Sequence, residues 1–85
     1  MPKSVFTEPY RQLLDLLVRT RRAAGVSQAE LAQRLGRPQP FVSYFERGER
    51  RVDVIEFFAI MQALGADPVE AFSDLARTLP GYVEI

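Results

Sequence analysis

Apolar residues recur along the chain at the three- and four-residue spacing of amphipathic helices. In the segment 9–24, Leu13, Leu14, Leu17 and Val18 form one stripe, and arginines are left to face solvent. Comparable stripes, with the caps and glycines that bound them, predict further helices over residues 27–35, 39–47, 54–64 and 68–78. The loops between them are short, so the sequence predicts a compact all-α domain of five helices.

The second and third predicted helices are joined by a tight turn. Ser27 and Glu30 have the spacing of a capping box, in which the hydroxyl and the carboxylate each satisfy a free amide of the first turn. Gly36 ends the second helix by supplying a left-handed backbone. The third begins by residue 39 or 40, because proline is tolerated in a first turn. Val42 and Phe45 are its expected inward residues.

The composition narrows the chemistry available to the chain. Its 85 residues suffice for one domain with a small core. They include no cysteine and no histidine, which removes disulfides, thiol nucleophiles and the usual zinc ligands. We therefore expect no enzyme activity, no metal and no cofactor. No apolar run approaches the roughly 20 residues that span a bilayer, so we expect a cytoplasmic protein without membrane contact.

The net charge of zero conceals an asymmetry between the two halves of the chain. Residues 1–51 contain ten Lys or Arg against five acids, giving +5, and residues 52–85 contain one Arg against six acids, giving −5. Such an asymmetry also arises by chance in a short chain. If it is functional, the basic half meets a polyanionic partner and the acidic half is turned away from it.

The helix pair, with its flanking residues, resembles the helix-turn-helix of the lambda-repressor-like (Cro/C1, or Xre) family of DNA-binding proteins. The resemblance extends from about residue 13 to residue 72. It rests on Ser27-Gln28-x-x-Leu31-Ala32-x-x-Leu35-Gly36, then Gln39, Val42-Ser43, Glu46-Arg47-Gly48, Ile60 and Leu64-Gly65. It implies the family's fold, double-stranded DNA as the partner, and a recognition helix at about residues 39–47 that enters the major groove.

Side chains of the recognition helix are the candidates for reading bases. Gln39 opens this helix and can pair in bidentate fashion with adenine N6 and N7. Ser43 and Tyr44 follow at the exposed spacing and can reach bases or backbone. Pro40 and Phe41 stand where the family usually has small polar residues. Either their edges touch a thymine methyl, or Phe41 is simply packed.

Phosphate contacts are predicted on both sides of that helix. Gln28 lies in the first turn of the second helix, where the family places a phosphate contact. Four arginines bracket the recognition helix and either neutralise phosphates or are solvated charges: Arg37, Arg47, Arg50 and Arg51. By resemblance, Arg21 and Glu46 form an internal ion pair between the first helix and the recognition helix, and neither contacts DNA.

These observations predict a sequence-specific transcriptional regulator acting as a homodimer on a palindromic operator, because one short helix reads too few base pairs. The alternative is a DNA-binding antitoxin or accessory module that works with a partner protein. We expect an N-terminal arm over residues 1–8, the DNA-binding domain over 9–78 and a tail over 79–85. Surplus apolar residues predict a dimer contact through the last helix and the tail. Alternatively, the tail folds back over the first and last helices and caps the monomer's own core.

Overall fold

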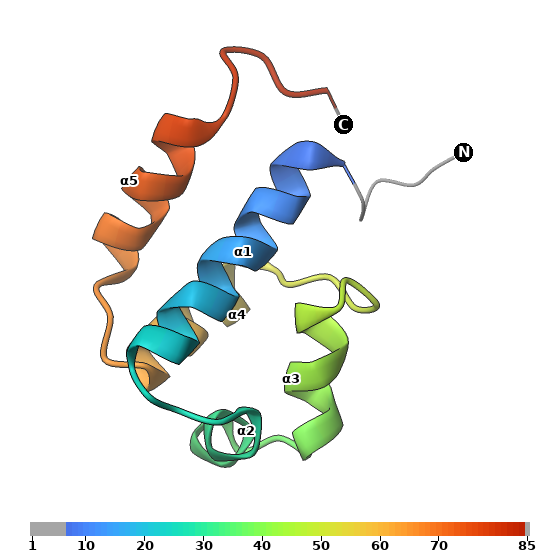
Figure 1. Cartoon of the computed structure of the whole chain (residues 1–85), viewed down its shortest axis with the longest axis vertical. Coiled ribbons are helices and arrows are strands. Elements are labelled where there is room, and N and C mark those ends of the chain that lie inside the picture. The colour runs from blue at the N-terminus through green and yellow to red at the C-terminus, as the bar shows by residue number, and fades with distance from the viewer. Residues whose placement is uncertain (1–6, 85) are drawn as a thin grey trace.

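The helices form where apolar residues recur at three- and four-residue spacing. In the computed structural model, which describes residues 7–84, the chain forms five α-helices over that range (Figure 1). They are α1 (Glu8–Ala23), α2 (Gln28–Leu35), α3 (Gln39–Glu46), α4 (Val54–Ala63) and α5 (Pro68–Thr78). The all-α prediction is confirmed, and the helix bounds differ from the predicted ones by no more than one residue. Thr7 is the N-cap of α1 and Glu8 its first residue; the rest of the predicted N-terminal arm, residues 1–6, lies outside the described range.

Side-chain caps fix where several helices begin. The Ser27 hydroxyl accepts a hydrogen bond from the Glu30 amide at 3.0 Å, as predicted. The Glu30 carboxylate, however, accepts a hydrogen bond from Arg34 Nη2 at 2.7 Å, so an ion pair replaces the reciprocal half of the predicted capping box. Arg34 lies one turn further along the same face of α2, within easy reach of Glu30. A complete capping box is present at α4, between Asp53 and Glu56.

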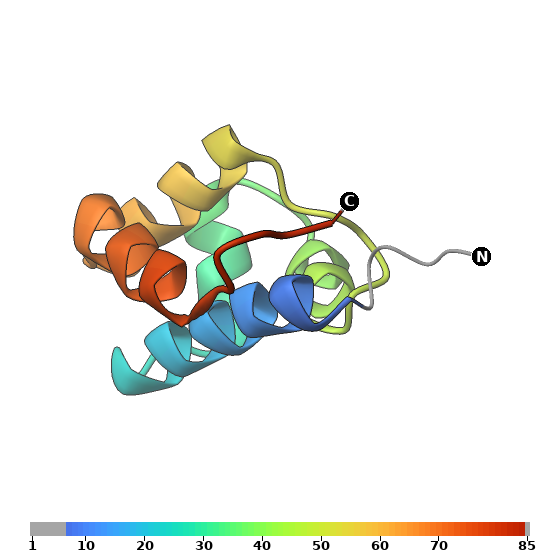
Figure 2. The ribbon, with the colours of Figure 1, turned by 90° about the horizontal axis from the view of Figure 1, so that it is seen from above.

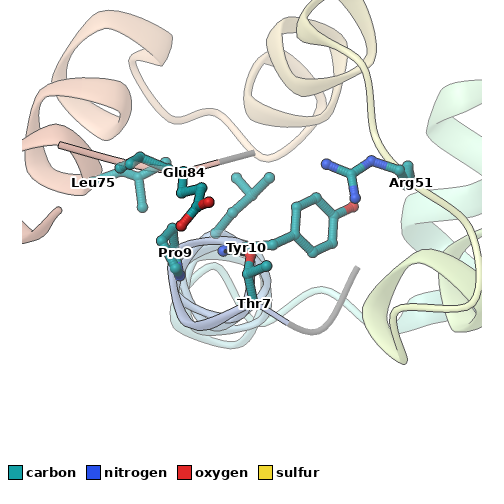
Figure 3. Close-up of a pocket in the computed structure, with 8 residues that line it drawn as sticks. Thr7, Pro9, Tyr10, Arg51, Leu75 and Glu84 are labelled. Atoms are coloured by element: carbon teal, nitrogen blue, oxygen red, sulfur yellow. Dashed lines mark hydrogen bonds between the residues drawn. The ribbon is translucent and has the colours of Figure 1, made fainter. Parts of the chain in front are cut away.

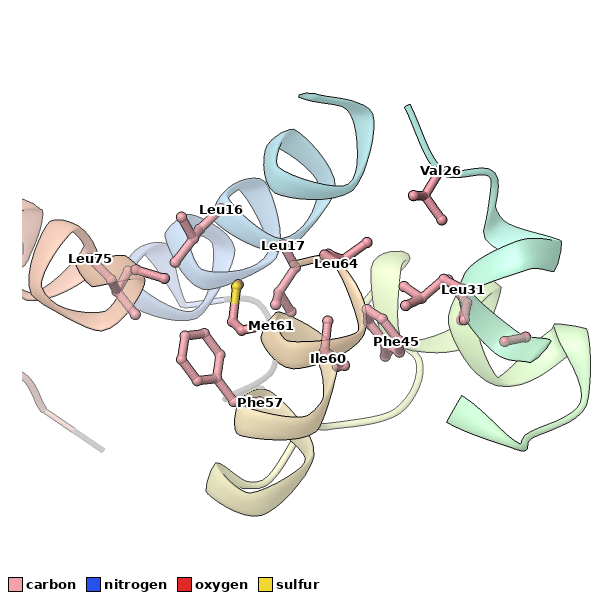
Figure 4. Close-up of a cluster of buried hydrophobic side chains, with 13 residues drawn as sticks. Leu16, Leu17, Val26, Leu31, Phe45, Phe57, Ile60, Met61, Leu64 and Leu75 are labelled. Carbon is pink, nitrogen blue, oxygen red and sulfur yellow. The ribbon is translucent and has the colours of Figure 1, made fainter. Parts of the chain in front are cut away.

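The core lies where the five helices meet, with α5 contributing Ala71 and Leu75. Val42 and Phe45 of α3 have no solvent exposure, which confirms the predicted inward face of this helix. The largest fully buried side chains come from four helices: Phe45, Leu17, Leu31, Ile60, Met61 and Val42. Figure 4 shows Phe45 and Ile60 beside one another near the centre of this cluster, with Leu31 approaching from α2. The helix-turn-helix is therefore part of the core and not an appendage to it.

Helix α1 separates α3 from α5. In Figures 1 and 2, α5 lies on one side of α1 and α3 on the other, and α4 lies behind α1 in the view of Figure 1. The domain measures 35 × 29 × 20 Å. Within residues 7–84, no helix combines the length and the apolar character that a membrane crossing requires. The outward surfaces of α3 and α5 thus face different directions.

The chain after α5 turns back toward the start of α1. Leu79 packs against the core, and Val83 is half-buried. Val83 and Glu84 border a pocket of about 380 Å³ between the tail and α1 (Figure 3). The other residues lining it are Thr7, Pro9, Tyr10, Leu13, Arg51 and Leu75. The path of the tail corresponds to the second of the two expected arrangements, in which it folds back over the first helix.

Candidate nucleic-acid interface

The turn between α2 and α3 fixes how α3 begins. Gly36 has a φ of 68°, in the left-handed region that glycine adopts without strain, and its amide donates to the Gln33 carbonyl at 3.1 Å. Pro38 is the N-cap of α3, and its carbonyl accepts a hydrogen bond from the Phe41 amide at 3.0 Å. Pro38 forms no side-chain cap. The fixed φ of the prolines at 38 and 40, rather than a side-chain hydrogen bond, therefore sets the first turn of α3.

A buried ion pair holds the other end of α3. Arg21 of α1 donates from Nε and Nη2 to the Glu46 carboxylate, at 2.7 and 3.1 Å. Its Nη1 donates to the Val26 carbonyl at 3.0 Å. Gln28 Nε2 donates to Glu46 Oε1 at 2.8 Å, so one carboxylate joins α1, α2 and α3. The predicted Arg21–Glu46 ion pair is confirmed, and Gln28 has a structural role that the sequence did not reveal.

The outward edge of α3 carries the predicted base-reading residues. Val42 and Phe45 fill the core on one side of the helix. On the other side, residues 39, 43 and 47 are four apart and share a face, as do residues 40 and 44. The exposed members of this set include Gln39, Pro40 and Tyr44, and Ser43 is half-buried. The fold therefore gathers the base-reading candidates, apart from Phe41, on one surface.

Phe41 lies inward of that edge, in a stack with two arginines. Its half-buried ring packs edge-to-face on Phe45, with ring centroids 5.5 Å apart and an interplanar angle of 72°. The Cζ atoms of Arg37 and Arg50 lie 5.0 and 4.8 Å from the centroid of the Phe41 ring. This geometry favours the packed alternative for Phe41 over a contact with a thymine methyl.

Arg50 is engaged by the protein itself. Its Nη1 and Nη2 donate to Glu56 Oε1 and Oε2 at 3.0 and 2.8 Å, and Nη1 also donates to the Arg51 carbonyl at 2.9 Å. The hydrogen bonds from Arg50, assisted by one from the Asp53 amide, lower the pKa of Glu56, and the same pair raises the pKa of Arg50. Arg50 thus links the end of the helix-turn-helix to the start of α4. A phosphate contact by Arg50 stays a prediction.

Arg47 and Arg51 each lie against an aromatic ring. Arg47 pairs with Glu49 at 3.1 Å on the surface, and its Cζ lies 5.5 Å from the centroid of the Tyr44 ring. Arg51 lies with its Cζ 4.4 Å from the centroid of the Tyr10 ring. An exposed ion pair contributes little to stability, so Arg47 can exchange the Glu49 carboxylate for a phosphate at small cost.

Tyr10 and Glu56 hold residues beside this surface in place and were missed by the sequence analysis. The Tyr10 hydroxyl accepts a hydrogen bond from the Val52 amide at 3.0 Å, which fixes the loop after α3 against α1. No spacing rule connects two residues 42 positions apart. The spacing of Asp53 and Glu56 does signal a capping box, but nothing in it points to Arg50 as a second partner.

A tight turn that begins at Gly36, a helix started by prolines and anchored at its end, and an exposed polar edge flanked by arginines together define a helix-turn-helix domain. A family model described as "Helix-turn-helix domain" matches residues 12–72. Over 60 residues the chain is 42% identical to the HTH-type transcriptional regulator y4dJ of Sinorhizobium fredii. The aligned residues cover 71% of this chain and 78% of that protein. It is 53% identical to the solved structure of an XRE-family like protein from Pseudomonas syringae pv. tomato str. DC3000, with a TM-score of 0.81 over 85% of this chain and 88% of that one. The protein belongs to the XRE-like helix-turn-helix family, which confirms the resemblance inferred from the sequence.

Proposed function

We propose that this protein is a sequence-specific transcriptional regulator that binds double-stranded DNA in the cytoplasm, as a homodimer on a palindromic operator. The observation that carries the proposal is the exposed edge of α3, on a helix fixed by prolines at its start and by Glu46 at its end. Because α3 is already fixed at both ends, it does not have to become ordered when it enters the major groove.

In this proposal, the exposed edge of α3 reads bases. Gln39 is exposed in the first turn, the part of a recognition helix that contacts base edges, and its amide pairs with adenine. Ser43 and Tyr44 lie one turn further on and contact a base or the sugar-phosphate backbone. Pro40, exposed beside Gln39, offers an apolar surface to a thymine methyl.

Contacts to the phosphates come from the two sides of α3. Arg37 precedes the helix and Arg47 follows it, so their guanidinium groups can meet phosphates across the groove. Arg51 adds positive charge in the loop that follows. Gln28, held in position by Glu46, contributes a phosphate contact together with the first turn of α2. These contacts fix the orientation of the protein and carry no sequence information.

The homodimer follows from the size of the recognition element. Helix α3 has eight residues, too few to specify an operator alone, and two copies related by a twofold axis read two half-sites about 34 Å apart. An operator with inverted symmetry is the direct consequence of that arrangement.

Selection of bound sequences from a pool of random duplexes tests this proposal, followed by a footprint on the DNA upstream of the protein's own gene. We expect an inverted repeat with half-sites separated by about one helical turn. Gln39→Ala should cost about 1–3 kcal/mol on the selected site and relax the preference at one position of each half-site. Binding without any sequence preference would contradict the proposal.

The matched control is Gln28→Ala, which we expect to weaken binding to all sequences alike, because Gln28 contacts phosphate and orients Glu46. If Gln39→Ala leaves the preference intact, Ser43 or Tyr44 is the main reader.

A further inference from the structure

The arginines around the recognition helix lie against aromatic rings. Four arginine–ring contacts are present among residues 7–84, and in each the arginine Cζ atom lies 5.5 Å or less from the ring centroid. A chain of this length contains about one such contact on average. The arginines involved are the four that were predicted to bracket the recognition helix: Arg37, Arg47, Arg50 and Arg51. Their concentration at the surface proposed to bind DNA indicates a role in that binding.

The Phe41 ring takes part in two of these contacts. The Cζ atom of Arg37 lies 5.0 Å from its centroid, and the Cζ atom of Arg50 lies 4.8 Å from it. Arg37 comes from the turn before α3, and Arg50 comes from the loop after α3. At such distances the negative face of an aromatic ring attracts a cation. One side chain of α3 thus contacts the segments at both ends of the helix.

Phe41 is itself held in place from two directions. Its ring packs edge-to-face on Phe45, which has no solvent exposure, so the core fixes one of its edges. On the loop side, Arg50 is held by its bidentate pair with Glu56. Arg37, in contrast, is exposed in the turn and has a long, flexible side chain. In the contact between Phe41 and Arg37, the ring is therefore the fixed partner, and the arginine is the partner that becomes ordered.

Ordering by a ring suits an arginine that binds phosphate. The ring attracts the guanidinium without using its N–H donors, so these stay available for phosphate oxygens. A carboxylate partner, such as Glu49 beside Arg47, occupies donors and has to be displaced first. Fixing one long side chain on binding lowers the affinity by roughly two- to tenfold. An arginine that is ordered before DNA arrives avoids part of this loss.

We propose that Phe41 is a positioning residue for DNA binding: its ring holds the Arg37 guanidinium ready for a phosphate at the start of α3, and Phe41 itself does not touch DNA. The inference rests on the proposed DNA-binding function and adds a residue that prepares one of its phosphate contacts. A small polar residue, which the family usually has at this position, could neither hold Arg37 nor pack on Phe45. Because phosphate contacts carry no sequence information, Phe41 raises the affinity for all duplexes and leaves the base preference unchanged.

Phe41→Leu and Phe41→Tyr in the full chain test the proposal, because leucine keeps an apolar side chain against Phe45 without a ring, whereas tyrosine keeps the ring. Fluorescence anisotropy gives the dissociation constants for two labelled duplexes, the sequence selected from the random pool and an unrelated sequence of the same length. Circular dichroism checks that each variant is folded. We expect Phe41→Leu to raise both constants by about three- to tenfold, and Phe41→Tyr to change neither by more than about twofold.

Three outcomes of this comparison would overturn the proposal. Unchanged constants in a folded Phe41→Leu would show that the ring does not contribute to binding. A loss confined to the selected sequence would show that the ring contacts a base. A loss in Phe41→Tyr as large as that in Phe41→Leu would show that the ring face is not what matters.

A double-variant cycle shows whether Phe41 acts through Arg37. Arg37→Gln removes the guanidinium, so the addition of Phe41→Leu to this variant should raise the dissociation constants by less than about twofold. If the two losses multiply in full, Phe41 affects binding by another route and the proposal is overturned.

The free wild-type protein supplies a measurement that does not depend on the folding of a variant. Protons held over the face of an aromatic ring resonate upfield, so NMR should show the δ-protons of Arg37 upfield of those of the exposed Arg77. Equal shifts would overturn the proposal. If the wild type binds both duplexes equally well and Phe41→Leu weakens both, the inference stands and the sequence-specific function falls. If the wild type selects its sequence and Phe41→Leu binds as the wild type does, the function stands and the inference falls.

Discussion

Nε of Arg21 lies 2.7 Å from Oε2 of Glu46, although the two residues are 25 positions apart in the sequence. Their side chains are only 11% and 6% exposed, so both charges are removed from water and depend on each other. Because Gln28 also donates to this carboxylate, the position of the recognition helix relative to α1 and α2 rests on one residue at its end.

Glu46→Ala should therefore lower the free energy of unfolding by about 3–5 kcal/mol, because it leaves the buried Arg21 guanidinium without its counter-charge. Urea denaturation followed by circular dichroism measures this change. Arg77→Ala is the control: it removes an exposed ion pair with Asp74 and should cost about 0.5 kcal/mol or less. Equal losses in the two variants would show that burial of the Arg21–Glu46 pair contributes nothing.

The salt dependence of DNA binding should distinguish arginines that meet phosphates from one that holds the fold. Each of Arg37→Gln and Arg47→Gln should flatten the slope of log K against log salt by about one unit, with little change in the thermal midpoint. Arg50→Gln should lower the thermal midpoint, because it breaks the bidentate pair with Glu56. Unchanged slopes in Arg37→Gln and Arg47→Gln would place the phosphate contacts elsewhere.

Acid should weaken the fold through Glu56. Its pKa is lower in the folded state than the value of about 4.3 expected in the unfolded chain, so its contribution is complete above about pH 5 and is lost as the pH falls through the folded-state pKa. Glu56→Gln lacks this ionisation. We expect the stability difference between wild type and Glu56→Gln to shrink steadily below about pH 5, as measured by denaturation at a series of pH values. A difference that is constant with pH would rule out the ionised pair as its source.

Removing a large side chain from the core of the helix-turn-helix should destabilise the whole domain. Phe45→Ala and Leu31→Ala should each cost about 2–5 kcal/mol, because both side chains are fully buried and their loss leaves cavities. In a domain of this size such a loss is a large part of the total stability. Differential scanning calorimetry gives the midpoints, and a wild-type midpoint in either variant would contradict the assigned packing.

Local rules predicted most of the fold, because they act between residues close in sequence. The Ser27 cap, the left-handed Gly36 and the inward Val42 and Phe45 all depend on neighbours within one or two turns. The resemblance to a known family supplied one longer link, between Arg21 and Glu46.

Pairings set by the relative placement of helices could not be predicted in the same way. The phosphate contact of Arg50 stays a prediction, but its pairing with Glu56, which follows from the approach of α4 to the end of α3, had no signal in the sequence. The apolar tail was predicted to contact a partner, with folding back onto α1 as the alternative, and it follows the path of the alternative. The contact between Tyr10 and Val52 had no signal at all.

On α3, the residues proposed to read bases are exposed, whereas the residues that hold the helix in the domain are buried. This separation has a consequence for evolution. Gln39 and Tyr44 can change after gene duplication at little cost to stability, because substitutions at exposed positions rarely shift the free energy of unfolding by more than about 0.5 kcal/mol. Glu46 and Phe45 cannot. A duplicated copy can therefore acquire a new operator through one or two exposed substitutions, each step passing through a folded protein, which is how a single scaffold can give rise to regulators of unrelated genes.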